Sequence, residues 1–315
     1  MKRIVLQKIY SVWRLLDEIT LVKWLNFDQY FNFHRLLNFK LRKIAFFLDQ
    51  GYDLNLDNPR TFNEKVVYRH LFERDSLLPY IVDKYKVREY VSEKIGEEYL
   101  IPLLQVADSF EKVDFYSLPE NYVMKMNHAS GRNIIVKNGV NHLGYSDKKL
   151  KEIFKTWFDE KYRFQQFIWF VQPIKRKIVI EELLVNQDGN IPKDYKFFVF
   201  DGKVEFIQVD QERFSEHKQN YYDKNWNRSN FSWRCPTGDM DEKPITLEKM
   251  LELSEKLASE FTFMRVDFYT FQEKIYFGEL TPCPGGGSAI FKPQDFDQYY
   301  GKLWSDKRLS RENKK

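Results

Sequence analysis

The sequence predicts an α+β protein whose sheets are mainly antiparallel. Helical patterns dominate the first hundred residues, and short strands separated by turn residues dominate from about residue 122. The strongest turn signal is Asp201-Gly202, which separates two apolar runs and is typical of a two-residue hairpin. Hairpins of this kind, with helices grouped before and between them, favour antiparallel sheets.

The composition is that of an ordinary globular protein. The 315 residues are 43% hydrophobic and 30% charged, which excludes disordered, collagen-like and coiled-coil chains. No apolar run approaches the roughly 20 residues that span a bilayer. Cys235 and Cys283 have no metal-type spacing, so we expect a reduced, cytoplasmic chain. A net charge of +4 is too small to indicate nucleic-acid binding.

Both ends of the chain are basic and the middle is acidic. Residues 1–50 carry nine basic and four acidic side chains, together with many aromatic ones. Such a segment is suited to peripheral contact with an anionic membrane at its inner face, and packing of helices on the body is the alternative. The tail, 305–315, is polar and basic.

Four helices are expected beyond the N-terminal segment. Thr61 and Glu64 have the spacing of a capping box, which predicts a helix from residue 61 to about 74. A second helix is expected from about Tyr80 to Lys94, with Gly96 as its C-terminal stop. The remaining two are expected over 147–159 and 246–260.

Strands are expected where short apolar runs lie between turn residues. These runs are 100–106, 122–126, 134–136, 178–185, 195–200, 203–209, 264–270 and 274–280. The polar segment 127–133 is expected to form the exposed tip of a hairpin, and a Gly/Pro cluster, 282–287, follows the last strand.

The last hairpin carries a group of charged side chains. With a three-residue connection Arg265, Asp267 and Glu279 converge on one face, whereas a two-residue turn points the carboxylates apart. Two carboxylates on neighbouring strands suit Mg²⁺, which takes oxygen ligands and shares them with phosphates. An exposed cross-strand salt bridge is the alternative.

Two further segments could bind a nucleotide. Lys125 lies near the end of a strand that leads into a loop with Ser130 and Gly131, whose backbone N–H groups could surround a phosphate; a surface hairpin tip is the alternative. Glu181 and Glu182 interrupt an apolar strand, where carboxylates need hydrogen-bond partners. An adenine amino group, a ribose hydroxyl or a lysine would serve.

Together and in this order, these segments resemble the ATP-grasp superfamily, and closely its TupA-like (teichuronopeptide biosynthesis) branch from bacterial surface-polysaccharide clusters. The resemblance extends from about residue 36 to 304. It implies an ATP-grasp fold with the nucleotide between two mainly antiparallel sheets. The segments that carry it are 58–65, 83–90, 95–102, 125–131, 194–198, 207–210, 265–269 and 277–281.

The resemblance also implies a role for each matching residue. Lys125 and Lys196 would hold the ATP phosphates, while Ser130 and Gly131 close over them. Thr281 stands where many relatives carry a metal-binding Asn, and its hydroxyl is a weaker ligand. The other implied roles are adenine recognition by Glu181, Glu182 and Leu183, Mg²⁺ binding by Asp267 and Glu279 with Thr281, and catalysis by Lys196 and by Arg265 at the transferred phosphoryl group.

The implied domain organisation has five parts. A helical extension, 1–57, precedes the helical part of the ATP-grasp body, 58–120. A small lid subdomain is expected over 121–180 and a large subdomain with the metal strands over 181–304. The tail covers 305–315.

The implied activity is that of an ATP-dependent carboxylate–amine ligase that uses Mg²⁺. Its expected partners are an amine and a uronate-containing glycan, or a nucleotide-sugar or lipid-linked precursor of one. A glycosyltransferase or another group transferase of polysaccharide biosynthesis is the main alternative, and a non-catalytic nucleotide-binding module is the other. The sequence does not indicate the oligomeric state.

A site for the acid substrate is expected next to the metal strands. Asp210, Arg213 and His217 follow directly from the strand that begins after Gly202. The Arg213 guanidinium would suit a carboxylate, and His217 could bind the anion or take a proton from the amine. A surface loop with an internal Asp210–Arg213 pair is the alternative.

Overall fold

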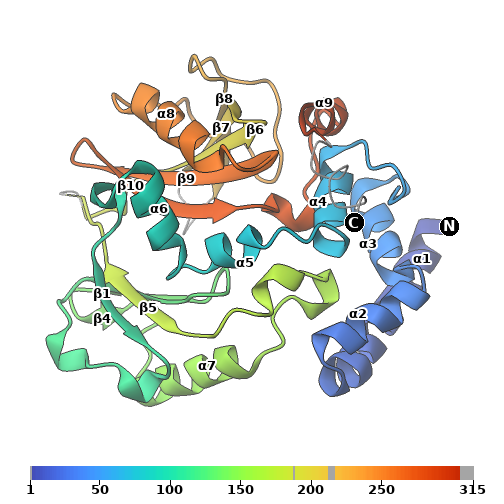
Figure 1. The fold of residues 1–315 in the computed structure, drawn as a ribbon, viewed down its shortest axis with the longest axis horizontal. Helices are drawn as coiled ribbons and strands as arrows, with labels where there is room; N and C mark the ends of the chain where they lie inside the picture. Colours follow the sequence, from blue (N-terminus) through green and yellow to red (C-terminus); the bar gives the residue numbers. More distant parts are fainter. Residues whose placement is uncertain (1, 187–188, 212–216, 306–315) are drawn as a thin grey trace.

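The computed structural model describes residues 2–186, 189–211 and 217–305. It contains two five-stranded antiparallel sheets with helices around them (Figure 1). The predicted α+β class with mainly antiparallel sheets is therefore confirmed. None of the described helices combines the length and apolar character needed to cross a bilayer.

The smaller sheet has the strand order β1-β5-β2-β3-β4. Its apolar face packs against α7 (Asp147–Asp159), which contributes Leu150 and Phe154 to the core. The opposite face carries Lys125 and Glu181. The strands are β1 (Leu103–Ala107), β2 (Tyr122–Met126), β3 (Asn133–Lys137), β4 (Val140–Asn141) and β5 (Ile178–Glu182).

The larger sheet has the strand order β10-β9-β6-β7-β8, and α8 (Leu247–Ala258) packs on its apolar face. The predicted hairpin at Asp201-Gly202 is confirmed, since both residues have positive φ, 44° and 80°, as a two-residue hairpin turn requires. The strands are β6 (Asp194–Phe200), β7 (Lys203–Gln211), β8 (Lys218–Tyr222), β9 (Phe263–Phe271) and β10 (Lys274–Thr281).

The capping box predicted at Thr61 is present. The Thr61 side chain accepts from the Glu64 backbone N–H, and the Glu64 carboxylate accepts from the Thr61 backbone N–H at the start of α4 (Phe62–Leu71). A buried cluster of mainly aromatic side chains holds α4 and α9 (Asp295–Leu303) against the end of the larger sheet. This cluster explains much of the aromatic content of the chain. Its aromatic members are Phe62, Phe198, Phe200, Phe206, Tyr221, Phe231, Trp233, Phe263, Phe291, Tyr300 and Trp304.

The single helix predicted from Tyr80 to Lys94 is wrong. The chain forms two shorter helices, α5 (Leu77–Val82) and α6 (Val87–Ile95). The break lies at Asp83, whose carboxylate accepts from the backbone N–H of Tyr85 and of Lys86. These side-chain hydrogen bonds take the place of backbone hydrogen bonds of a continuous helix, which is how an Asp side chain competes with helix formation.

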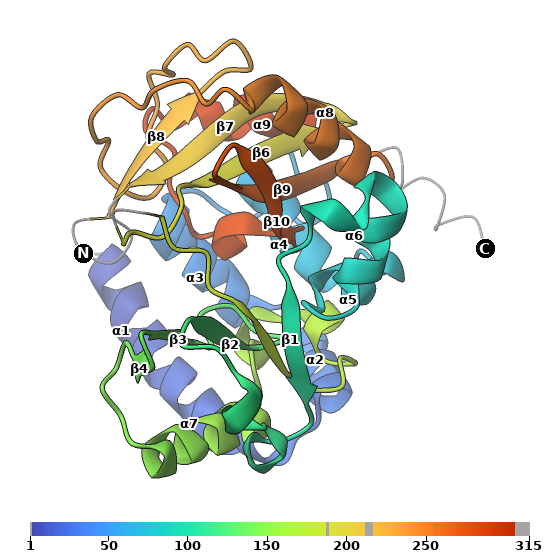
Figure 2. The same ribbon diagram turned by 90° about the vertical axis from the view of Figure 1, so that its left-hand side faces the viewer.

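The N-terminal extension is helical, as predicted. It consists of α1 (Lys2–Asp17), a π-helical turn (Glu18–Val22), α2 (Phe27–Leu36) and α3 (Lys40–Gln50), which lie together on one side of the two sheets (Figures 1 and 2). Packing on the body is shown for α2 and α3, since Tyr30, Phe39 and Phe46 share a buried cluster with Phe164 and Phe167.

Short 3₁₀ turns complete the chain. They are η2 (Glu97–Tyr99), η3 (Phe110–Lys112), η4 (Phe115–Ser117), η5 (Phe164–Gln166), η6 (Trp169–Val171) and η7 (Pro284–Gly287).

Two other expectations need correction. The segment 127–133 is not simply an exposed tip, because Asn127, His128 and Ala129 are buried against the body. The strand predicted over 178–185 ends at Glu182.

The domain boundaries stay a prediction. Strand pairing places β1 and the Glu181-Glu182 pair in the smaller sheet. Apart from Ser305, the basic tail lies outside the described residues.

Glu64 should contribute strongly to stability. Its buried carboxylate accepts from the backbone N–H of Asn55, Arg60 and Thr61 at 2.8–3.1 Å, so it fixes the chain that enters α4. We expect Glu64→Ala to lower the free energy of unfolding by about 2–4 kcal/mol in urea titrations, because three backbone donors lose their shared acceptor. Glu93→Ala, at an exposed position of α6, should change it by less than about 0.5 kcal/mol. Equal effects would contradict this role.

Candidate active site

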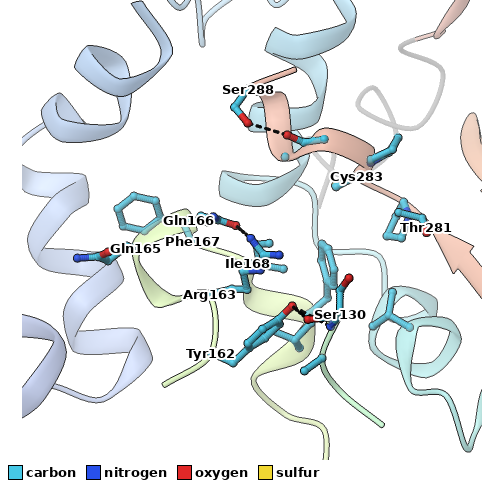
Figure 3. Close-up of a pocket in the computed structure, with 18 of the residues that line it drawn as sticks. Ser130, Tyr162, Arg163, Gln165, Gln166, Phe167, Ile168, Thr281, Cys283 and Ser288 are labelled. Atoms are coloured by element: carbon cyan, nitrogen blue, oxygen red, sulfur yellow. Dashed lines mark hydrogen bonds between the residues drawn. The ribbon is translucent and has the colours of Figure 1, made fainter. Parts of the chain in front are cut away.

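A cavity of about 660 Å³ lies where the larger sheet, the loop between β2 and β3 and the N-terminal helices meet. The polar face of the larger sheet forms one wall, with Lys196, Asp210, Arg265 and Glu279. Figure 3 shows two other walls, the segment around Tyr162 to Ile168 and the turn that carries Cys283 and Ser288.

A row of polar side chains crosses the larger sheet. Gln208, Lys196, Asp267 and Glu279 are register partners on four adjacent strands, from β7 through β6 and β9 to β10. Directly paired residues point to the same face, so these side chains converge although the chain positions are far apart.

Lys196 is the centre of this row. Its buried ammonium forms ion pairs with Asp194, with Asp210 at 3.3 Å and with Asp267 at 3.3 Å. Burial opposes the charge, yet Asp194, Asp267 and Asp210 raise the pKa of Lys196 above its usual range. Lys196 therefore stays charged and is suited to an anionic ligand.

Arg265 joins the two carboxylates of the last hairpin. It donates to both oxygens of Asp267 at 2.6–2.7 Å and to Glu279 at 2.6 Å. Burial raises the pKa of Asp267 to about 6, against the opposing effect of Arg265 and Lys196. Burial acts to raise the pKa of Glu279, but the positive charges of Arg265, Lys84 and Lys196 outweigh it and lower this pKa to about 2.

The convergence of Asp267 and Glu279 has a different cause from the one expected. The connection is a two-residue turn, Gln272-Glu273, which by itself would point the carboxylates apart. A β-bulge at Gly278 shifts the register by one residue and places Glu279 opposite Asp267. A Cβ at Gly278 would lie 3.0 Å from the Asp267 carbonyl oxygen, so glycine suits the bulge.

The residues of the last hairpin fit a magnesium ion. Asp267 and Glu279 are neighbouring carboxylates, and the Thr281 hydroxyl donates a hydrogen bond to Glu279 at 2.9 Å. All three side chains would offer the metal a hard oxygen ligand. In the described part of the chain no three His, Cys, Asp or Glu side chains form a complete metal centre. Mg²⁺ usually takes one or two carboxylates together with substrate phosphates, so a partial set suits it.

Lys125 and Glu181 meet on the smaller sheet. Lys125 Nζ lies 2.6 Å from Glu181 Oε2, and Arg88, which has no expected role, donates to Glu181 Oε1 at 2.9 Å. Glu182 is exposed and Leu183 is buried. The three residues expected to recognise adenine therefore differ in exposure, and Glu181 forms an ion pair with Lys125.

The loop between β2 and β3 is anchored by Tyr162. The Ser130 backbone N–H donates to the Tyr162 hydroxyl at 2.8 Å (Figure 3). Ser130 and Gly131 are exposed at the end of the loop, and Gly131 has a φ of 72°. Arg132, which follows, forms a two-bond pair with Glu160.

Lys84 is a cavity residue to which sequence reasoning gave no role. Its ammonium donates to the Ala129 carbonyl oxygen at 2.6 Å, and burial lowers the pKa of Lys84 although Glu279 acts in the other direction. His128 also lines the cavity, and neither ring nitrogen has a hydrogen-bond partner among the described residues. The sequence predicted a continuous helix at this position, whereas Lys84 lies in the break between α5 and α6.

The expected acid-substrate site is only partly described. Asp210 contacts Lys196 and accepts from Gln208 and Gln219 at 2.8 Å, so it belongs to the Lys196 cluster. His217 Nε2 lies 3.3 Å from Asp210 Oδ1. Arg213 lies outside the described residues. The Gly/Pro cluster borders the cavity through Pro282 to Gly286.

The family follows from a comparison with known sequences. The model of the TupA-like ATPgrasp family matches residues 64–305, which is most of the chain. The chain belongs to the TupA-like ATP-grasp family. The expected membership of an ATP-grasp enzyme family is thereby confirmed, and the matched region contains both sheets and every predicted site residue. No curated protein matches the chain significantly.

Several solved ligases share a low level of similarity with this family member. D-alanine–D-alanine ligase from Bacillus anthracis, complexed with ATP, is 18% identical, with a TM-score of 0.41 over 71% of this chain and 62% of that one. The corresponding ligase from Helicobacter pylori is 14% identical, with a TM-score of 0.40 over 78% and 66%. A RiPP-associated ATP-grasp ligase from Chryseobacterium gregarium is 13% identical, with a TM-score of 0.36 over 89% and 70%. This chain spans less than two thirds of the first two.

Removing either carboxylate of the last hairpin should abolish ATP turnover. We expect Asp267→Asn and Glu279→Gln each to lower the rate of Mg²⁺-dependent ADP formation by roughly 100-fold or more, since each loses an anionic oxygen ligand. Glu248→Gln, on α8 at the opposite face of the larger sheet, is the matched control and should keep full activity. Full turnover in both site variants would restore the cross-strand salt bridge as the explanation.

Proposed function

We propose that the protein is an ATP-dependent carboxylate–amine ligase. It joins a uronic acid of a cell-surface polysaccharide, or of a nucleotide-sugar or lipid-linked precursor, to an amino acid or another amine. The observation that carries this proposal is that Lys196, Arg265 and Glu279 line one wall of a cavity that Lys84 also lines. Asp267 lies directly beside them, in contact with Lys196 and Arg265.

The reaction divides into two balanced steps. A carboxylate oxygen of the acid attacks the γ-phosphorus of ATP, ADP leaves, and an acyl phosphate forms. The amine nitrogen then attacks the acyl carbon, phosphate leaves, and the nitrogen loses a proton. Activation is needed because an unmodified carboxylate would have to expel oxide.

The side chains divide this work between the two sheets. Lys125 and Lys196 would hold the phosphates, Ser130 and Gly131 would close over them, and Glu181 to Leu183 would border the adenine. Asp267, Glu279 and Thr281 would hold Mg²⁺, which offsets the charge of the phosphates. Arg265 lies beside both carboxylates and would stabilise the transferred phosphoryl group.

The nucleotide released tests this function. With ATP, an amine panel and uronate-containing glycans, we expect ADP and phosphate formation to rise at least about tenfold only when acid and amine are both present. Glu279→Gln, purified in parallel, controls for contaminating ATPases. Release of UDP from a UDP-sugar, without ATP consumption, would instead identify a glycosyltransferase.

We further propose that α1 holds the cytoplasmic enzyme at the inner face of an anionic membrane. One side of this helix is apolar and faces outward, with exposed fractions of 40–61%. Trp24, at 76%, and the nearby basic side chains Lys8 and Lys23 add to the same surface. The apolar residues are Ile4, Val5, Ile9, Val12, Trp13, Leu15 and Leu16, together with Ile19 in the π-helical turn that follows α1.

Charge substitutions on this apolar side should weaken membrane binding. We expect the double variant Val12→Glu and Leu16→Glu to reduce partitioning into phosphatidylserine-containing vesicles by roughly tenfold or more in sedimentation assays. The control pair Gln7→Glu and Ser11→Glu adds the same charge to exposed polar positions of α1 and should have a smaller, salt-sensitive effect. Equal losses in both pairs would rule out insertion of the apolar side.

A further inference from the structure

The wall of the cavity opposite the phosphoryl-transfer residues is built by the N-terminal extension. These helices precede the family match, which begins at residue 64. On α1 the lining residues Tyr10, Arg14 and Asp17 follow helical spacing, on the side away from the exposed apolar residues. The lining residues of α3 are Leu41, Arg42, Ala45, Leu48 and Asp49.

Arg42 is the unusual residue in this wall. Its exposed fraction is 7%, yet no described carboxylate lies within ion-pairing distance, and Nε has no hydrogen-bond partner among the described residues. Nη2 donates to the Gly286 carbonyl oxygen at 2.7 Å, which aims the guanidinium at the η7 turn on the cavity wall. A buried cation with so little compensation is costly unless a ligand supplies the anion.

The surrounding charges favour an anion. Seven basic side chains and four carboxylates are present among the described lining residues. Asp17, the acid nearest on α1, is already bonded by Tyr30 and His34. Asp49, on α3, reduces the positive charge around Arg42 but forms no ion pair with it. Exposed arginines that line the cavity, Arg14, Arg163 and Arg234, would attract anions to it.

We propose that Arg42 is the centre of a second anion-binding subsite, separate from the nucleotide phosphates, for a carboxylate or phosphate group of the acid substrate. This inference rests on the proposed ligase function and specifies its substrate class. The acid is a multiply charged anion, with its reacting carboxylate near Arg265 and a further oxyanion at Arg42. The planar guanidinium suits either group, through two parallel hydrogen bonds.

Binding measurements on the full chain test this subsite without turnover. The nucleotide site is first filled with Mg²⁺ and a non-hydrolysable ATP analogue, and inorganic pyrophosphate or a diuronate is then titrated by calorimetry. We expect saturable binding to the unaltered protein and a loss of roughly tenfold or more in Arg42→Gln, since a charge-assisted bond is removed. Preferential binding of pyrophosphate indicates a diphosphate-linked sugar, and preferential binding of the diuronate indicates a polyuronate.

Three further variants separate binding from a structural role. Arg42→Lys keeps the charge and should retain part of the affinity, and Arg35→Gln, an exposed arginine of α2 outside the cavity lining, should retain all of it. Ala45→Glu places a carboxylate one turn from Arg42 without removing its bond to Gly286, and it should weaken anion binding even if Arg42→Gln does not fold. Affinity for the ATP analogue should stay within twofold throughout.

Several outcomes would overturn the subsite. The first is that neither probe binds once the nucleotide site is filled. The second is that Arg42→Gln lowers the melting temperature but leaves probe affinity unchanged, which would make Arg42 an anchor for the η7 turn. The third is an equal loss of affinity for probe and nucleotide analogue. None of these measurements depends on ADP formation, so a failed ligase assay would be a separate result.

Discussion

The buried charges on the polar face of the larger sheet are the constraint on which the rest of the structure depends. Lys196 is enclosed by three carboxylates, and Arg265 bridges one of them to Glu279. Buried charges are costly unless they are paired in good geometry, and removing one partner of such a pair typically costs about 3–5 kcal/mol. Strand register, and with it the apolar packing of α8 on the other face, must therefore agree with this pattern.

A single irregularity makes that agreement possible. The two-residue turn at Gln272-Glu273 sets a register in which Asp267 would face Gly278, and the bulge then moves Glu279 into that place. The bulge occurs where a side chain would meet the Asp267 backbone, so the position of Glu279 opposite Asp267 depends on the glycine at 278. The site thus depends on a departure from regular strand pairing.

The N-terminal helices combine two surfaces on one element. The inner side of α1 carries polar cavity residues, while its outer side exposes apolar ones. The aromatic cluster around Phe167 connects α2 and α3 to η5 and to α4, so the extension shares a core with these two elements. The cavity wall and the exposed apolar surface have a fixed relation because both are sides of the same helix.

The sequence by itself determined the features that depend on neighbouring residues. Capping at Thr61, the Asp201-Gly202 turn and the alternation of β9 follow from local hydrogen bonds and backbone angles, and the order of Lys125, Glu181, Lys196 and Arg265 indicated the family. Only the tertiary structure decided which residues far apart in the sequence contact one another. Arg42 meets Gly286 across 244 residues, Arg88 meets Glu181 across 93, and Lys84 meets Ala129 across 45. No local periodicity encodes such contacts, because burial and charge pairing between separate elements select them after the chain has folded.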